Sequence, residues 1–158
     1  MIYKTIPYKD YADVEHEKTF FFSLNQAEFT VLNGRLPGGL DGYITKMVED
    51  RDPSKIVELL MMFIVEGYGI RESDDDFIKE DPQGRKLGLR FKCSEACDNL
   101  IMELLKNDNS IWEFIIGMLP KSAQAKAQAA FDDAMARKEK EDNKVVALPT
   151  SESGTPNT

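Results

Sequence analysis

The stretch from Asp52 to Ile70 constrains the fold most, because it forms one helical pattern that is apolar on almost every side. Asp52 is suited to cap this helix and Pro53 fits its first turn. A helix that is apolar nearly all round is usually buried, and this one is too short to span a bilayer. We expect Gly67 and Gly69 to end it in the left-handed conformation. The residues predicted to face the core are Ile56, Leu59, Leu60, Phe63 and Ile64.

The N-terminal residues 2–11 and 14–24 have the alternation of a β-hairpin. Phe20 and Phe22 lie on the apolar face of the second segment, and the other face is polar except for Phe21. Pro7 lacks a backbone N–H, which favours an edge strand or a bulge at that position. A hairpin is therefore predicted at the start of the chain.

A helix is predicted to begin at Asn25, since Asn25 and Glu28 have the spacing of a capping box. Leu24 and Phe29 have the positions of a hydrophobic staple around the same start. Periodic apolar residues predict three further helices, over 40–49, after Ser94 and over 111–119.

The acidic segment 68–92 has a different character from the helices around it. Phe77 and Ile78 are expected to form a short extended piece, and Leu87 and Phe91 one short helical turn. Gly88 lies in that turn and lowers its helix propensity by about 1 kcal/mol relative to Ala. The fold class predicted for the chain is α+β, with a hairpin packed on a mostly helical single domain.

The composition changes after residue 120, which predicts a globular domain over 1–120, a solvent-projecting helix over 121–141 and a disordered tail over 142–158. The helix carries a thin stripe whose members fall at i, i+4, i+7 and i+8 and which we expect to be exposed. We predict that this stripe is part of a partner-binding site. The alternative is that the face folds back on the domain or pairs with its own copy. The stripe residues are Ala127, Phe131, Ala134 and Met135.

The net charge of -8 argues against a nucleic-acid backbone as partner. The same acidity keeps open an alternative function, that of a nucleic-acid-mimicking inhibitor of a host DNA-processing enzyme. No charged-then-apolar leader pattern is present at the N-terminus. We therefore expect a cytoplasmic protein whose cysteines, Cys93 and Cys97, are free thiols.

The sequence predicts no catalytic, cofactor-binding or metal-binding residues. A calcium loop counted from Asp74 fails, because positions six and twelve are Lys79 and Arg85 rather than Gly and Glu. The two cysteines would need further N or S ligands to bind zinc, and the chain holds one histidine, His16. Cys97 lies on an apolar helical stripe and is expected to be a small buried residue. An enzymatic function is not expected.

An ordered series of short motifs resembles the tail assembly chaperones of long-tailed phages and prophages of Gram-positive bacteria. The motifs are FFFSLNQAEF (20–29), LPGGLDGYI (36–44), DPSKIVELL (52–60), GYGIRESDDDFIK (67–79) and LGLRFKCSEACDNLIMEL (87–104). Their order and spacing cover residues 20–104, which is most of the predicted globular part.

This resemblance implies a non-enzymatic protein that binds the phage tape measure protein and keeps it soluble while tail tube subunits polymerise around it. It further implies contacts with the tail tube protein and with a longer, frameshifted form of the chaperone itself. The resemblance also implies that the protein acts in the host cell cytoplasm and is absent from the mature virion. Neither nucleic acid nor a membrane is an expected partner.

Overall fold

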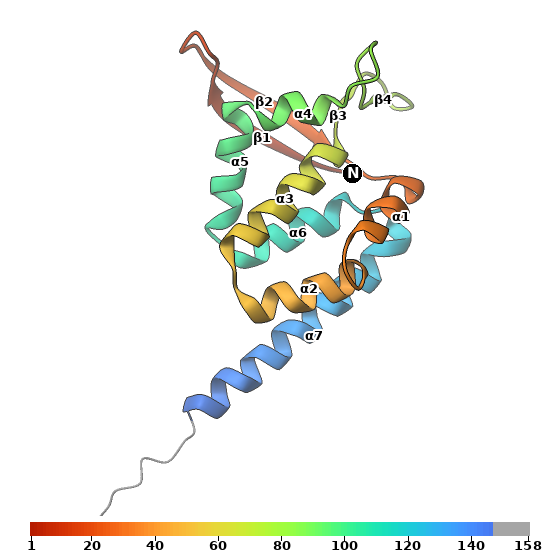
Figure 1. Cartoon of the computed structure of the whole chain (residues 1–158). Helices are drawn as coiled ribbons and strands as arrows, with labels where there is room; N and C mark the ends of the chain where they lie inside the picture. The colour runs from red at the N-terminus through yellow and green to blue at the C-terminus, as the bar shows by residue number, and fades with distance from the viewer. Residues whose placement is uncertain (147–158) are drawn as a thin grey trace, which may run out of the picture.

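The computed structural model describes residues 1–146, which form four strands and seven helices. A sheet lies at one end of the molecule and the last helix crosses the opposite end (Figure 1). The α+β class with an N-terminal hairpin and a mostly helical domain is confirmed. The elements are β1 (Ile2–Lys9), β2 (Glu15–Phe22), α1 (Gln26–Arg35), α2 (Gly39–Asp50), α3 (Pro53–Gly67), β3 (Tyr68–Arg71), β4 (Phe77–Ile78), α4 (Leu87–Lys92), α5 (Glu95–Leu105), α6 (Asp108–Met118) and α7 (Lys121–Val146).

The predicted hairpin is the first half of an antiparallel sheet with strand order β1-β2-β3-β4. β1 and β2 pair from Ile2 opposite Phe22 to Lys9 opposite Glu15. β1 is an edge strand, which accommodates Pro7 as predicted. Beyond the hairpin, β2 pairs with β3, and β3 pairs in turn with β4.

The central helix α3 begins as predicted, with the Asp52 side chain accepting a hydrogen bond from the Ser54 N–H. Four of the five predicted core residues are buried, whereas Ile56 is only half-buried. The predicted left-handed ending is wrong, because the chain leaves the helix in the extended conformation at Tyr68. Gly67 serves close packing instead, since a Cβ there would lie 2.3 Å from Sδ of the buried Met118.

Two local predictions of helix structure are confirmed. Asn25 and Glu28 form a complete capping box at α1, and residues 87–92 form the short helix α4. Glycine occupies position 88 despite its low helix propensity, for a reason that the sequence did not reveal. A Cβ at Gly88 would lie 2.1 Å from the carbonyl oxygen of Val65, so α4 can pack directly on the α3 backbone only with glycine there.

An aromatic cluster joins the sheet to the helices. Tyr68 stacks on Phe91 of α4 with ring centroids 4.5 Å apart and planes at 17°. Phe22 of β2 meets Phe114 of α6 edge-on at 5.0 Å. Such contacts stabilise a core beyond the apolar area they bury, so the sheet is fixed on α4 and α6.

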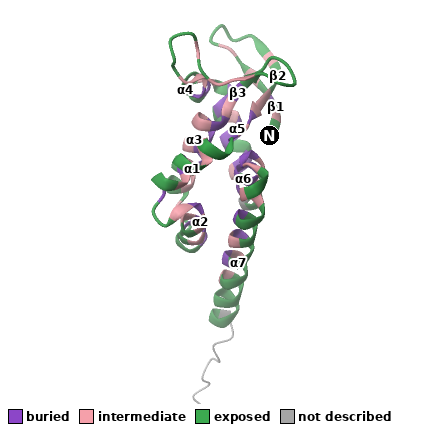
Figure 2. Ribbon diagram, turned by 90° about the vertical axis from the view of Figure 1, so that its right-hand side faces the viewer, coloured by how far each residue is buried: buried purple, intermediate pink, exposed green. Residues whose placement is uncertain are grey.

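The C-terminal helix α7 runs from Lys121 to Val146, and its C-terminal end extends past the other helices (Figures 1 and 2). It is longer than the predicted 121–141, because residues 142–146 continue the helix. The rest of the predicted tail, 147–158, lies outside the described residues. Within residues 1–146, none of the helices has the length and apolarity needed to cross a lipid bilayer.

Candidate interaction surfaces

The predicted stripe of α7 faces the body of the protein rather than solvent. Ala127, Phe131 and Ala134 are buried, with Phe131 only 8% exposed, and Met135 is half-buried. Figure 2 shows buried turns along the part of α7 beside the other helices and exposed turns at its far end. The expectation of an exposed stripe is wrong, because the stripe packs on an apolar surface of the same chain.

That apolar surface is formed by α2 and α6, and α7 packs along both. The ring of Phe131 lies against the indole of Trp112 in α6, with centroids 5.6 Å apart and planes inclined at 35°. We name the surface the α2–α6 groove. The buried apolar residues shown beside α7 are Met47 and Val48 of α2, with Ile111 and Trp112 of α6.

The polar contacts of α7 with α1, α2 and the adjoining Arg51 lie at the surface. Lys126 Nζ lies 3.3 Å from Asp41 Oδ2, and Arg51 lies 3.5 Å from Asp142 Oδ2. The Lys126 side chain is 83% exposed. Exposed ion pairs of this kind contribute little to stability, so apolar packing holds α7 in place.

A pocket of about 390 Å³ remains beside the C-terminal part of the stripe. Met47, Ile56, Leu105, Trp112 and Met135 give it largely apolar walls, and Arg51 and Lys138 lie at it as well. The walls come from α2, α3, α5, α6 and α7. The side chains of α7 therefore do not fill the α2–α6 groove completely.

A second apolar surface lies on α3, and we call it the α3 open face. It forms a shallow hollow of about 420 Å³ whose apolar members are Val57, Met61, Met62, Val65 and Leu89. The four α3 residues are half-buried and Leu89 is 51% exposed. One side of a helix that the sequence predicted to be enclosed is thus accessible to a partner.

Lys79 of the segment after β4 connects the acidic loop to the body. Its Nζ donates hydrogen bonds to the Ser23 carbonyl oxygen, to the Glu28 carboxylate at 2.6 Å and to the Glu66 carbonyl oxygen at 3.3 Å. The Lys79 side chain is only 18% exposed. One cation therefore fixes this segment to the start of α1 and the end of α3, a contact that no local motif had indicated.

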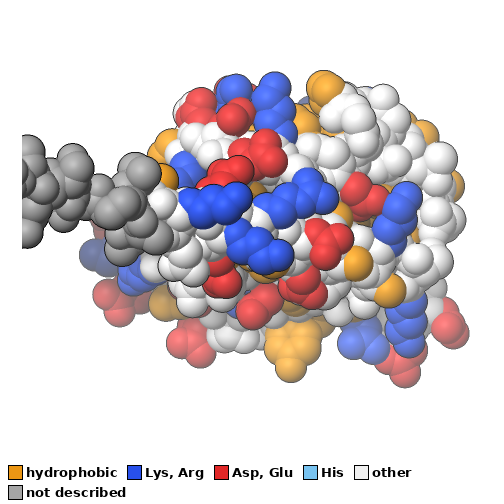
Figure 3. Space-filling model, turned by 90° about the horizontal axis from the view of Figure 1, so that it is seen from below, with side chains coloured by type: hydrophobic (Ala, Val, Ile, Leu, Met, Phe, Trp, Pro, Cys, Tyr) orange, Lys and Arg blue, Asp and Glu red, His pale blue; other side chains and the backbone are white. Residues whose placement is uncertain are grey.

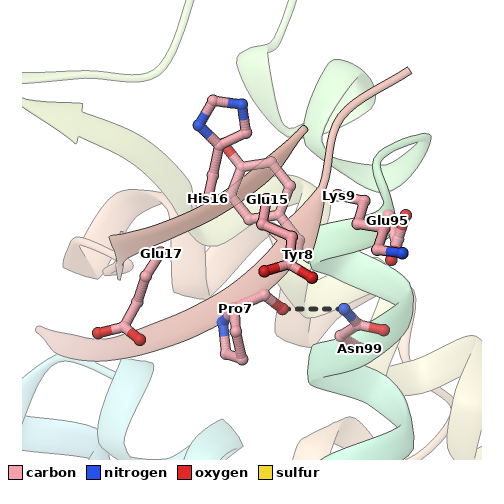
Figure 4. A pocket seen from close by; sticks show the side chains of 8 residues that line it. All are labelled: Pro7, Tyr8, Lys9, Glu15, His16, Glu17, Glu95 and Asn99. Atoms are coloured by element: carbon pink, nitrogen blue, oxygen red, sulfur yellow. Dashed lines mark hydrogen bonds between the residues drawn. The ribbon is translucent and has the colours of Figure 1, made fainter. Parts of the chain in front are cut away.

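The pocket at the far end of the hairpin is polar (Figure 4). Asn99 of α5 donates to the Pro7 carbonyl oxygen at 2.9 Å, which occupies part of the sheet edge. His16 stacks on Tyr8 with centroids 5.4 Å apart and hydrogen-bonds to Asp10 at 2.8 Å. His16 thus supports the hairpin turn.

Asp74 of the acidic loop and the thiol of Cys97 have contacts that explain them without a bound metal or a reaction. Asp74 pairs with Arg71 at 2.6 Å, and no group of three metal-ligating side chains converges anywhere in residues 1–146. Cys97 is buried as predicted, and this burial raises the pKa of its thiol to about 12. Since the thiolate is the nucleophile, Cys97 is chemically inert at neutral pH.

Basic and acidic side chains alternate on the face that contains α7 and α2 (Figure 3). Mimicry of nucleic acid requires carboxylates in continuous rows, since the phosphates of a duplex carry regularly spaced negative charge. The interspersed pattern of this face does not offer such rows.

A profile of the phage tail assembly chaperone family matches residues 1–156. Searches of curated proteins and of solved structures gave no match. Because the family match spans almost the entire sequence, it covers the sheet and all the described helices, including α7. The chain therefore belongs to the phage tail assembly chaperone family.

Proposed function

We propose that this chaperone binds the tape measure protein of its phage and keeps it soluble during tail assembly, without catalysing a reaction. The family match over residues 1–156 carries the proposal. A tape measure protein is long, helical and apolar, so its chaperone must offer apolar surface while remaining in solution itself. The net charge of -8 favours solubility of the chaperone.

The α3 open face supports the proposal as an accessible contact surface. Met61 and Met62 have flexible, polarisable side chains that adapt to apolar partners of different shape. A client with many different apolar helical segments requires such adaptability. This face is the first contact that we assign to the tape measure protein.

Direct contact between the α7 stripe and the tape measure protein stays a prediction. Ala127, Phe131 and Ala134 are buried on the α2–α6 groove, so they can reach a partner only when α7 leaves it. Contacts with the tail tube protein and with a frameshifted longer form are part of the same proposal. So are action in the host cell cytoplasm and absence from the mature virion.

Co-expression tests the proposal. The tape measure protein of the same phage is produced with wild-type chaperone, with the Met61→Gln/Met62→Gln variant, or alone. We expect wild-type chaperone to raise the soluble fraction of the tape measure protein and to copurify with it, and the double variant to do so less. Met102→Gln is the matched control, because Met102 is exposed on α5 and does not line the hollow of the α3 open face. An unchanged soluble fraction with wild-type chaperone would refute the proposal.

A further inference from the structure

We propose that the α2–α6 groove is a docking site for an amphipathic helix of the tape measure protein, which displaces α7 from it. This inference rests on the proposed function and adds to it a second, covered binding surface. In this account α7 is an internal substitute for the client: it covers the groove when no tape measure protein is bound.

The α2–α6 groove carries larger apolar side chains than α7, the helix that covers it. The groove carries large buried side chains, such as Met47, Ile111 and Trp112. The cover contributes mainly alanine methyl groups, and only Phe131 and Met135 are large. Apolar stabilisation scales with the area removed from water. A helix that carries larger apolar residues and lies further from α2 than α7 does would therefore bury more apolar area on this groove.

The pocket of about 390 Å³ shows where a better-fitting helix gains contacts. Its walls include Met47, Ile56, Leu105 and Trp112, and Met135 of α7 reaches it without filling it. Unfilled space deprives the lining atoms of dispersion contacts. A large apolar side chain entering from a partner helix would restore those contacts.

The attachment of α7 permits this exchange. Its ion pairs with Asp41 and Arg51 are solvent-exposed and weak, so the client helix has mainly to replace the apolar contacts of the stripe. Residues 119–120 connect it to α6 in the chain. In our proposal α7 swings away about this joint while the core formed by α3, α5 and α6 stays in place.

The charges at the groove indicate what kind of helix enters. Asp41 lies near one end, where it pairs with Lys126, and Arg51 lies near the other, where it pairs with Asp142. At a rise of about 1.5 Å per residue the two α7 positions are roughly 24 Å apart along the helix. A client helix with a basic residue near its start and an acidic residue about four turns later would replace both ion pairs.

A covalent lock of α7 tests the inference. Asp41→Cys and Lys126→Cys are introduced together in a Cys93→Ser background, because Cys93 is exposed whereas Cys97 is buried. A short bifunctional maleimide then joins α2 to α7. The phage's tape measure protein is diluted from denaturant into each chaperone preparation, and the amount that stays soluble after centrifugation is measured. The same variant capped with a monofunctional maleimide is the control.

We expect the locked chaperone to need at least about tenfold higher concentration than the capped control for half-maximal solubilisation, a loss of about 1.4 kcal/mol of binding free energy. Equal activity of the locked and capped forms would overturn the inference and leave the proposed function intact. If wild-type chaperone keeps no tape measure protein soluble, the proposed function fails and this inference fails with it.

A second variant acts on the pocket without a cross-link. Met135→Phe places a larger side chain at the pocket and should hold α7 more firmly. We expect a higher Tm together with weaker solubilisation of the tape measure protein. A higher Tm with undiminished solubilisation would contradict displacement of α7.

Discussion

Phe131 of α7 packs against Trp112 near the start of α6, with ring centroids 5.6 Å apart. This contact joins the C-terminal helix to the helical core, since Trp112 itself is buried. A helix whose sequence is mostly polar is thereby made part of the folded domain.

Replacing Phe131 by Ala should destabilise the protein. The change removes the contact with Trp112 and leaves a cavity under α7, and losses at buried phenylalanines are roughly 3–5 kcal/mol. Urea unfolding followed by circular dichroism measures the effect. Val145→Ala is the control on the same helix, because Val145 is exposed, and its free energy of unfolding should change by less than about 0.5 kcal/mol. Equal unfolding midpoints for both variants would show that α7 is not packed on α6.

Gly88→Ala should destabilise the protein although alanine is the better helix former. The new methyl group would lie 2.1 Å from the Val65 carbonyl oxygen, so α4 would have to move away from α3. Gly34→Ala in α1 is the matched control, because a Cβ there meets nothing within 4 Å. That substitution should stabilise α1 by up to about 1 kcal/mol. The two variants are thus expected to shift the urea midpoint in opposite directions, and a shift in the same direction would contradict the close packing of α4 on α3.

Lys79→Met should loosen the acidic loop. The change leaves the Ser23 and Glu66 carbonyl oxygens and the Glu28 carboxylate without their shared donor. Loss of hydrogen bonds to a charged group of this kind costs roughly 1–3 kcal/mol. Hydrogen exchange should rise in residues 71–86, and Lys126→Met, which changes an exposed side chain, should leave that exchange unchanged. Unaltered exchange in the Lys79 variant would show that the loop is held by other contacts.

Features encoded within a few residues could be predicted from the sequence. The capping box at Asn25, the N-cap Asp52 and the buried Cys97 all depend on local spacing, and all three are confirmed. Features that depend on distant pairing could not. The stripe of α7 looked exposed because nothing in 121–146 shows that α2 and Trp112 offer a matching surface. Gly67 was predicted to end its helix and Gly88 to weaken its helical turn, whereas the role of each depends on a distant neighbour, Met118 and Val65 respectively.

The hairpin turn should lose stability in acid. Hydrogen bonds from His16 and from the backbone N–H groups of Val14 and Ala12 hold the pKa of Asp10 below its ordinary value of 3.8. Because the folded-state pKa is lowered, this contribution is present above about pH 4 and is lost as the pH falls through the folded-state pKa. Wild type should therefore exceed Asp10→Asn in urea midpoint at about pH 6, and the difference should shrink towards zero below pH 3.8. A difference that is independent of pH would contradict this role of Asp10.

Removal of the chaperone from the infected cell tests the central claim most directly. A phage with an early stop codon in this gene is grown in its host, and the tape measure protein is followed by fractionation and immunoblotting. We predict that the tape measure protein moves to the insoluble fraction, that no complete tails form, and that wild-type chaperone supplied from a plasmid restores both. Soluble tape measure protein and normal tails without the chaperone would contradict the account.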